Sequence, residues 1–349
     1  MPWTKIYTNK VEFEKAATGK KLRGLTYREA ILEATDQAME DDPDVFVMGQ
    51  GVDDCVAVFG TTSGLIEKFG PTRVMDTPLA ENGITGIATG AAIAGMRPIL
   101  VNMRVDFLPL AMDQLINHAS KWHYMFGGAA NVPLTIRAIT GRGWGSAAQH
   151  SQALHALLAH IPGLKVVMPA SPYDAKGLLL AAIYDNNPVL FLEHRWLYEH
   201  IGHVPEERYT VPIGKGIIRK EGRGITIAAV SHMVSETLAA SSILAEKGID
   251  AEVIDLRSLK PLDAGLVIES VKKTGRLLIA DTGWKEYGIG AEIAARVFEH
   301  GFSYLKAPVE RIALPDVPAP ASHVLEAAYY PGKDDIIKAA ELAFRYGLE

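Results

Sequence analysis

The chain has 349 residues, a length that predicts two domains of ordinary size. Apolar residues make up 48% of it and charged residues 22%, and no apolar stretch reaches the length of a membrane span, so a soluble globular protein is expected. The net charge of -6 argues against a nucleic-acid-binding protein, which would carry a basic face. Cys55 is the only cysteine, which excludes an intrachain disulfide and a thiolate metal cluster and fits a reducing cytosol. The first residues lack the apolar core of a secretory signal, so we expect a cytoplasmic protein.

Residues 1–24 are polar and predict an irregular N-terminal arm. The first helix is predicted over residues 26–39, because Thr26 and Glu29 form a capping-box pattern ahead of apolar residues at helical spacing. Apolar runs and helical patterns then alternate along the chain. Strands are predicted at residues 44–49, 74–75, 97–103, 134–138, 164–168 and 189–193, and further helices at 63–69, 110–126 and 172–185.

A polar, proline-marked stretch at residues 196–212 separates this pattern from a second one, so we expect a domain boundary between residues 205 and 206. In the second part, strands are predicted at 225–230, 251–255, 276–280 and 309–313, and helices at 234–247, 263–273, 288–299 and 333–346. The strands are continuous apolar runs, as expected when helices cover both faces of a parallel sheet. The sequence therefore predicts an α/β protein with an arm (1–24) and two doubly wound domains (25–205 and 206–349) with mostly parallel sheets.

Glu81 is the first candidate for chemistry. Thr77 and Pro78 end the preceding strand, and Glu81 then opens a segment rich in glycine and alanine. The carboxylate thus stands at a loop-to-helix junction beyond the carboxyl end of a strand, where ligands of such sheets usually bind. The alternative is an ordinary acidic residue stabilised by the positive end of a helix.

His150 is the second candidate, because it follows a glycine-rich loop at residues 141–146 that allows a ligand to approach closely. A histidine there could act as a general acid, a base or a hydrogen-bond donor, or could simply cap a turn. His155 and His160 are expected to be core or surface groups, since a spacing of five does not align them on one helix face. The sequence lacks a P-loop, a complete dinucleotide-binding fingerprint and the HExxH metal motif.

Seven short motifs occur in an order that makes the resemblance to one family specific. They are DTPLAE at 76–81, MDQLIN at 112–117, AQHSQ at 148–152, PGLKVV at 162–167, DNNP at 185–188, VPIGK at 211–215 and GIGAE at 288–292. From about residue 24 to the end, the chain resembles the β chains of thiamine-diphosphate-dependent 2-oxo acid dehydrogenases, the group with pyruvate, branched-chain and acetoin dehydrogenase β chains. Related transketolases carry the same two domains after a diphosphate-binding domain, which we therefore expect on another polypeptide here.

The resemblance implies a transketolase-like pyrimidine-binding domain followed by a transketolase C-terminal-like domain. It implies an α2β2 heterotetramer in which thiamine diphosphate is shared between the chains and the α chain holds the diphosphate and its Mg²⁺. The expected reaction is decarboxylation of a 2-oxo acid followed by reductive acylation of a lipoyl-bearing acyltransferase. The sequence does not identify the 2-oxo acid, because much of the substrate pocket is expected to come from the α chain.

The resemblance also assigns roles to residues. Glu81 matches the glutamate that binds a pyrimidine nitrogen of the cofactor and favours its imino tautomer. Met103 and Phe107 match positions that line or stack on the aminopyrimidine, although a methionine and a phenylalanine at this spacing would otherwise be core residues. His150 matches a histidine on the substrate side, which stabilises the intermediate or moves the acyl group to the lipoyl carrier.

A structural potassium ion is a further implication of the resemblance. The matching positions, which supply mainly backbone oxygens, are Leu134, Ala182, Ile183, Asp185 and Asn187. The same residues could instead form an ordinary turn at the end of a helix.

This sequence departs from the family pattern at two places. Gln50 replaces an acid thought to belong to a proton path between two cofactor sites, and Arg142 and Trp144 stand where small residues are usual. Two other functions remain open at this point. One is half of a split transketolase that moves ketol units between sugars, and the other is a non-catalytic β-like interaction subunit. The presence of Glu81, Phe107 and His150 argues against the second.

Overall fold

The computed structural model describes residues 4–54, 56–141 and 145–346 of the chain. The chain forms two compact units. Unit 1 comprises residues 1–140 and 157–213, and unit 2 comprises residues 141–156 and 214–349. The segment 141–156, which carries His150, therefore packs with unit 2 although it lies inside the sequence of unit 1.

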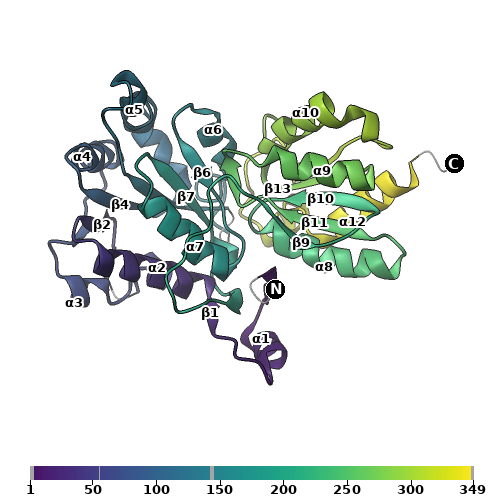
Figure 1. Ribbon diagram of the computed structural model, residues 1–349, viewed down its shortest axis with the longest axis horizontal. Coiled ribbons are helices and arrows are strands. Elements are labelled where there is room, and N and C mark those ends of the chain that lie inside the picture. The colour runs from purple at the N-terminus through teal and green to yellow at the C-terminus, as the bar shows by residue number, and fades with distance from the viewer. Residues whose placement is uncertain (1–3, 55, 142–144, 347–349) are drawn as a thin grey trace. The chain divides into compact units, whose positions relative to one another are not determined.

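Unit 1 is built on a parallel sheet whose strand order is β6-β7-β5-β4-β2-β3. The strands are β2 (Val45–Gly49), β3 (Val74–Asp76), β4 (Arg97–Asn102), β5 (Thr135–Thr140), β6 (Lys165–Val167) and β7 (Val189–His194). Helices α2 (Tyr27–Asp41) and α7 (Pro172–Ile183) lie side by side on one face, and α4 (Glu81–Ile93) covers the other (Figure 1). Every residue of β2, β5 and β7 is buried, as the continuous apolar runs predicted.

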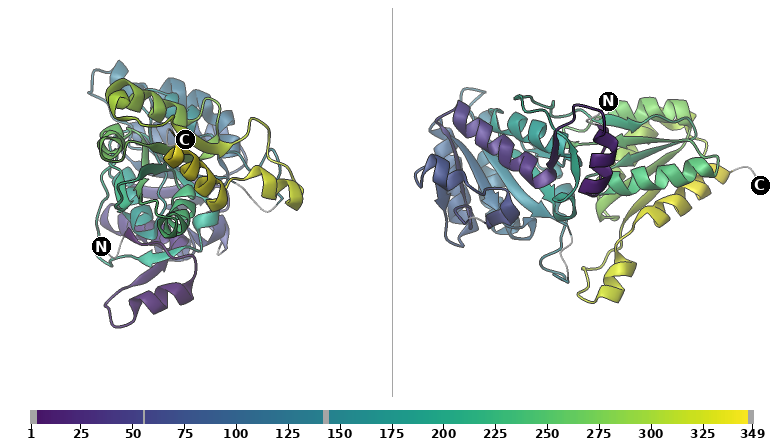
Figure 2. Two further views of the ribbon diagram at one scale, coloured as in Figure 1. Left: turned by 90° about the vertical axis from the view of Figure 1, so that its right-hand side faces the viewer. Right: turned by 90° about the horizontal axis from the view of Figure 1, so that it is seen from below.

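The N-terminal part of unit 1 is more ordered than expected. The prediction of an irregular arm is wrong for α1 (Lys10–Ala17), which begins at Asn9, whose side chain accepts a hydrogen bond from the Glu12 amide, and which buries Phe13. Strand β1 (Gly24–Thr26) pairs antiparallel with β8 (Ile201–His203), and α1 protrudes from the rest of unit 1 (Figure 2). The capping box of α2 is confirmed.

The single helix predicted over residues 110–126 is wrong in its form. The chain winds through a 3-10 helix, η3 (Val105–Ala111), a π-helix, η4 (Gln114–Ala119), and a short α5 (Trp122–Met125). Pro109 lies inside η3, and the Ser120 hydroxyl donates to the carbonyl of Ile116 at 2.8 Å. The Ser120 carbonyl also packs directly on Gly163, where any Cβ would overlap it, so tertiary packing fixes this irregular winding.

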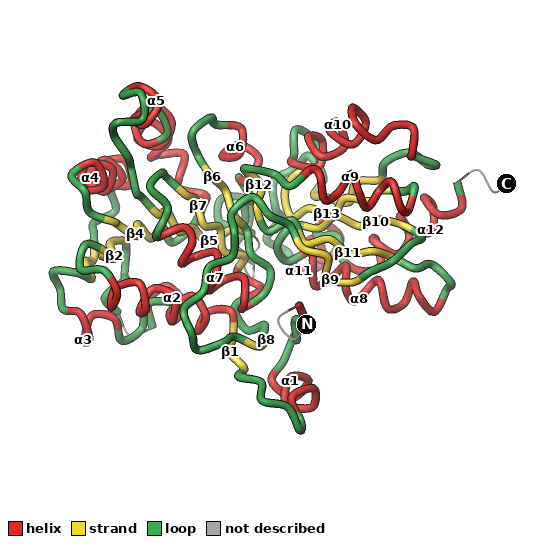
Figure 3. Tube along the Cα trace, viewed as in Figure 1, coloured by secondary structure: helices red, strands yellow, loops and turns green. Residues whose placement is uncertain are grey.

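Unit 2 is a second α/β unit with strand order β14-β13-β10-β11-β9, in which only β9 is antiparallel. Its strands are β9 (Ile217–Lys220), β10 (Ile225–Ala229), β11 (Ala251–Asp255), β13 (Leu277–Trp284) and β14 (Glu310–Leu314). Its helices are α8 (Met233–Glu246), α9 (Ala264–Thr274), α10 (Ile289–Gly301), α11 (His323–Tyr329) and α12 (Lys333–Arg345). Helices α9 and α10 pack together on one side of these strands, and α8 and α12 on the other (Figure 3).

The predicted fold class is confirmed, because both units have mostly parallel sheets covered by helices on two faces. The sequence patterns did not predict α11 or the antiparallel strand β9. Across the described part of the chain, every helix is too short or too polar to cross a membrane.

Candidate functional site

Glu81 is the first residue of α4, as predicted. Strand β3 ends at Asp76, and the Thr77 amide donates to the carbonyl of Gly49 at 3.1 Å, which ties the following turn to the end of β2. The helix begins without a capping side chain at Ala80. Glu81 therefore stands beyond the carboxyl ends of β2 and β3, near the unsatisfied amides of the first turn of α4.

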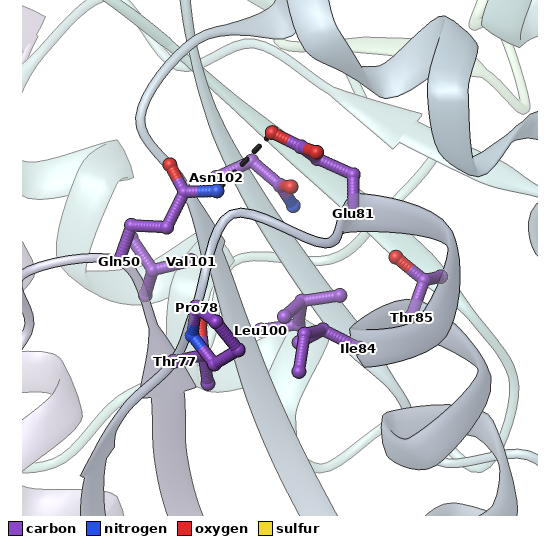
Figure 4. A pocket seen from close by; sticks show the side chains of 9 residues that line it. All are labelled: Gln50, Thr77, Pro78, Glu81, Ile84, Thr85, Leu100, Val101 and Asn102. Atoms are coloured by element: carbon purple, nitrogen blue, oxygen red, sulfur yellow. Dashed lines mark hydrogen bonds between the residues drawn. The ribbon is translucent and has the colours of Figure 1, made fainter.

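A small concavity lies beside Glu81. Its nine lining residues come from the ends of β2 and β4, the turn after β3 and the first turn of α4: Gln50, Thr77, Pro78, Glu81, Ile84, Thr85, Leu100, Val101 and Asn102 (Figure 4). Glu81 is the one ionisable side chain among them. The Gln50 side-chain amide donates to Glu81 Oε1 at 3.1 Å. A half-buried carboxyl thus faces a small, otherwise uncharged site.

Two buried polar atoms in this concavity lack a partner within the described residues. They are the Asn102 amide nitrogen and the Thr85 hydroxyl, whose residues are only 6% and 1% exposed. A buried donor left unpaired costs about 1–3 kcal/mol, so a ligand with a suitable acceptor would bind favourably here. The sequence analysis missed both residues. The available signal was an asparagine at the carboxyl end of an apolar strand.

Met103 and Phe107 lie on the loop that leaves β4. Met103 is half-buried and packs against the hydrophobic core, while Phe107 is half-buried within η3. Between them, Arg104 and Asp106 form a buried ion pair at 3.0 Å that holds the loop. Neither Met103 nor Phe107 lines the concavity itself. Both lie beyond the carboxyl end of β4, the strand that supplies Leu100, Val101 and Asn102 to its lining.

His150 is half-buried in the segment of unit 2 that precedes α6 (His155–His160). The Gly141 amide donates to the carbonyl of Gln152 at 3.0 Å, and the Gly145 amide donates to Glu326 of α11 at 3.3 Å. These contacts hold both ends of the glycine-rich loop. Arg142 and Trp144, which depart from the family pattern, lie outside the described residues.

The prediction that His155 and His160 are core or surface groups is confirmed. His155 lies in the core, and His160 lies on the surface. The ring of His155 is fully buried, and its Nε2 lies 2.9 Å from Asp281 Oδ1 of β13. The two groups are at ion-pair distance without the alignment of a hydrogen bond. The sequence analysis missed this pair, because the two residues are far apart along the chain.

The positions expected to bind potassium gather where α7 ends and β7 begins. The Arg97 guanidinium donates to the carbonyls of Ile183 and Asp185 at 3.1 and 3.2 Å, and the Lys165 ammonium pairs with the Asp185 carboxylate. The backbone amide of Asn187 donates to Asp185 Oδ1 at 2.9 Å, as is common in a turn. The side-chain oxygen Oδ1 of Asn187 is buried and has no partner among the described residues. Oxygens are therefore gathered here, with two cationic side chains already beside them.

Comparison with known proteins identifies the family. Residues 23–200 match the transketolase pyrimidine binding domain, and residues 214–336 match the transketolase C-terminal domain. The chain is 46% identical to the acetoin:2,6-dichlorophenolindophenol oxidoreductase subunit beta of Bacillus subtilis, over 90% of this chain and 96% of that protein. It is also 46% identical to the pyruvate dehydrogenase E1 component subunit beta of Rickettsia felis, over 93% and 99%. The chain belongs to the β-subunit family of pyruvate dehydrogenase E1 components and acetoin oxidoreductases.

Membership of this E1 β family confirms the resemblance seen in the motifs and favours it over a split transketolase. A solved split gene transketolase, described as an inactive beta4 tetramer, superimposes with a TM-score of 0.73 at 24% identity, covering 92% of this chain and 99% of that one. At that identity the match speaks for the transketolase-like fold alone. In this E1 β chain, the Glu81 concavity belongs to the pyrimidine binding domain, and His150 lies in the same matched region.

Proposed function

We propose that this chain is the β subunit of a thiamine-diphosphate-dependent 2-oxo acid dehydrogenase, which decarboxylates a 2-oxo acid and passes the acyl group to a lipoyl-bearing acyltransferase. One observation carries the proposal. In a chain of the E1 β family, a single carboxyl, that of Glu81, faces a concavity with no other ionisable lining residue. A lone acid at the start of a helix beside a small concavity suits proton control on a bound heterocycle.

The residues of the concavity fit an aminopyrimidine. Glu81 would hold a ring nitrogen, and the unpaired donors of Asn102 and Thr85 would meet ring acceptors. Met103 and Phe107, on the loop after β4, would line the ring face. When bound, thiamine diphosphate supplies the electron sink for decarboxylation, and the protein's part is to orient it and favour its imino tautomer through Glu81.

A partner chain is part of the proposal. Exposed apolar side chains gather on and around α4: Leu79 is 81% exposed, Ile87 61%, Met96 39% and Ile93 37%. Such a surface is costly in water and suits burial against another subunit. We assign it to an α chain in an α2β2 assembly, which would also hold the diphosphate and its Mg²⁺ through carboxylate, carbonyl and phosphate oxygens.

A structural potassium ion fits the end of α7. The buried, unpartnered oxygen of Asn187 and the carbonyls of Leu134, Ala182, Ile183 and Asp185 are hard ligands of the type this ion prefers. Because Arg97 and Lys165 already neutralise part of this site, the ion would stabilise it rather than create it.

His150 is proposed to act on the substrate side of the site. If it moves the acyl group, His150→Ala should reduce the complete reaction with a lipoyl acceptor more than decarboxylation with an artificial electron acceptor. Equal losses in both assays would place His150 at decarboxylation, and no loss in either would contradict a chemical role.

The function is tested by reconstitution with an α chain. Calorimetry should show weak thiamine diphosphate binding to the isolated chain and tight binding to the pair, because the diphosphate carries most of the cofactor's charge. The pair should then turn over one member of a panel of 2-oxo acids and acylate a lipoyl domain. Micromolar binding with turnover by the single chain would contradict the two-subunit assembly, and ketol transfer between sugars would favour the transketolase alternative.

A further inference from the structure

We propose that Gln50 is a positioning residue for Glu81: its side-chain amide orients the carboxyl and keeps the site's single ionisable proton from being shared with a second acid. The inference rests on the proposed function and deepens it. Gln50 Nε2 donates to Glu81 Oε1 at 3.1 Å, across 31 residues of sequence, and both side chains line the concavity (Figure 4).

The backbone on both sides of Gln50 is fixed by neighbouring strands. Gly49, the last residue of β2, packs so closely on β4 that a Cβ there would overlap the carbonyl oxygen of Val101. The Gly51 amide donates to Asp76 Oδ1 of β3 at 2.6 Å, and the Gly49 carbonyl accepts from the Thr77 amide. Gln50 is thus held between β3 and β4, which places its amide beside Glu81 rather than leaving it to sample solvent.

The chemistry of an amide differs from that of an acid at this point. The Gln50 nitrogen donates a hydrogen bond but has no proton to exchange near neutral pH. One Glu81 oxygen is engaged by Gln50, so the other is left to share a proton with a ring nitrogen of the ligand. A carboxyl in place of the amide would instead share one proton with Glu81, because two carboxylates at hydrogen-bond distance do not both ionise readily.

Among the described residues of the elements packed against α4, no other charged side chain lines this concavity. Those elements carry Arg97 on β4, Asp106 on η3 and His118 on η4, and Asp76 ends the neighbouring β3. None of the four is among the nine lining residues, and Asp106 is paired with Arg104. Within the described part of the chain, Gln50 is therefore the group that sets the electrostatic surroundings of Glu81 in the concavity.

The test uses the reconstituted α–β enzyme with Gln50→Glu and Gln50→Leu. For Gln50→Glu, we expect the acidic limb of the pH profile of kcat/KM to move upward by about one pH unit or more, since the shared proton must be lost first. For Gln50→Leu, we expect kcat to fall about tenfold with little change in KM for the 2-oxo acid, as for loss of a hydrogen bond to a charged group. The near-ultraviolet circular dichroism of the bound cofactor should report less imino tautomer in both variants.

Gln37→Leu is the matched control, because Gln37 is a buried glutamine of unit 1 whose side-chain amide likewise donates, to the carbonyl of Glu206 at 2.9 Å. It should alter thermal stability and leave the pH profile unchanged. Glu81→Gln, measured alongside, separates the two proposals. If Glu81→Gln abolishes turnover while both Gln50 variants keep the wild-type pH profile and kcat within twofold, the positioning role is wrong and the proposed function stands. If Glu81→Gln itself retains full turnover, the proposed function of the site fails and the role of Gln50 fails with it.

Discussion

Glu81 in unit 1 and Asp281 in unit 2 occupy similar local positions but have opposite surroundings. Glu81 is the first residue of α4, and Asp281 lies within β13, one residue beyond Ala280, which pairs with the last residue of β10. Asp281 is 2% exposed, faces the His155 ring at 2.9 Å and accepts from the Gly283 amide at 3.2 Å. Glu81 is half-buried and accepts a hydrogen bond from the neutral amide of Gln50.

The difference shows how the same placement serves two purposes. The buried Asp281 carboxyl faces an ionisable ring, and the small concavity beside it is also lined by the cationic Lys285 and Arg311. The half-buried Glu81 carboxyl lies beside a neutral amide and an otherwise uncharged concavity, which supports its proposed role in binding a ligand and moving a proton. We therefore expect the partner of each acid, and not its place in the fold alone, to decide its role.

The largest expected effect is on turnover, which Glu81→Gln should reduce strongly and Asp281→Asn should leave unchanged. Glu81→Gln keeps the shape and removes the acid, so the reconstituted enzyme should lose at least about a hundredfold in kcat, as when a key proton-transfer or electrostatic group is removed. Glu67→Gln, at the exposed start of α3 (Leu65–Phe69), is the matched control and should retain normal turnover. Near-normal turnover of Glu81→Gln with cofactor bound would contradict the assignment.

The pH dependence of stability tests a second buried histidine, His200, whose pKa is shifted mainly by burial, whereas His155 faces the Asp281 carboxyl. Burial lowers the pKa of His200 to about 4, below the ordinary 6.5. The unfolded chain therefore binds more protons between these values, so the stabilising contribution is present above pH 6.5 and is lost as pH falls toward 4, by about 3 kcal/mol in total. Urea unfolding of wild type and His200→Gln over this range measures the effect, with the exposed His123→Gln as control. Identical pH dependence in all three would contradict it.

Asp281→Asn tests the structural side of the comparison. The variant keeps the shape but removes the charge opposite His155, so the free energy of unfolding should fall by about 1–3 kcal/mol. Turnover per folded molecule should be unchanged, measured on the reconstituted enzyme below its melting temperature. A loss of turnover like that of Glu81→Gln, with unchanged stability, would show that Asp281 also takes part in chemistry.

The smallest expected effect concerns the unpaired amide of Asn102. Asn102→Leu removes a buried donor that a ligand acceptor would satisfy, so thiamine diphosphate affinity of the reconstituted enzyme should fall about three- to tenfold. The unliganded protein should be equally or more stable, because the unpaired group is gone. Asn117→Leu, whose exposed amide donates to Asp113, is the control. Unchanged affinity would mean that Asn102 does not meet the ligand.

The sequence by itself determined the two α/β units, most strand and helix positions, the start of α4 at Glu81 and the E1 β family. These features depend on short-range periodicity, capping and motif order, all of which are local. The same local patterns misjudged α1 and the winding of residues 105–125, where the cap at Asn9 and the contact between Gly163 and Ser120 override them.

Only the tertiary structure decided which groups meet. Two contacts join residues that are distant in sequence: the Gln50–Glu81 hydrogen bond and the His155–Asp281 pair. The burial of the Asn102 amide without a partner and the packing of segment 141–156 with unit 2 are likewise non-local. No local pattern encodes such contacts, because they arise from how strand ends converge in the folded sheets. The sequence located Glu81, and the fold determined that this acid meets a neutral amide while Asp281 meets an ionisable ring.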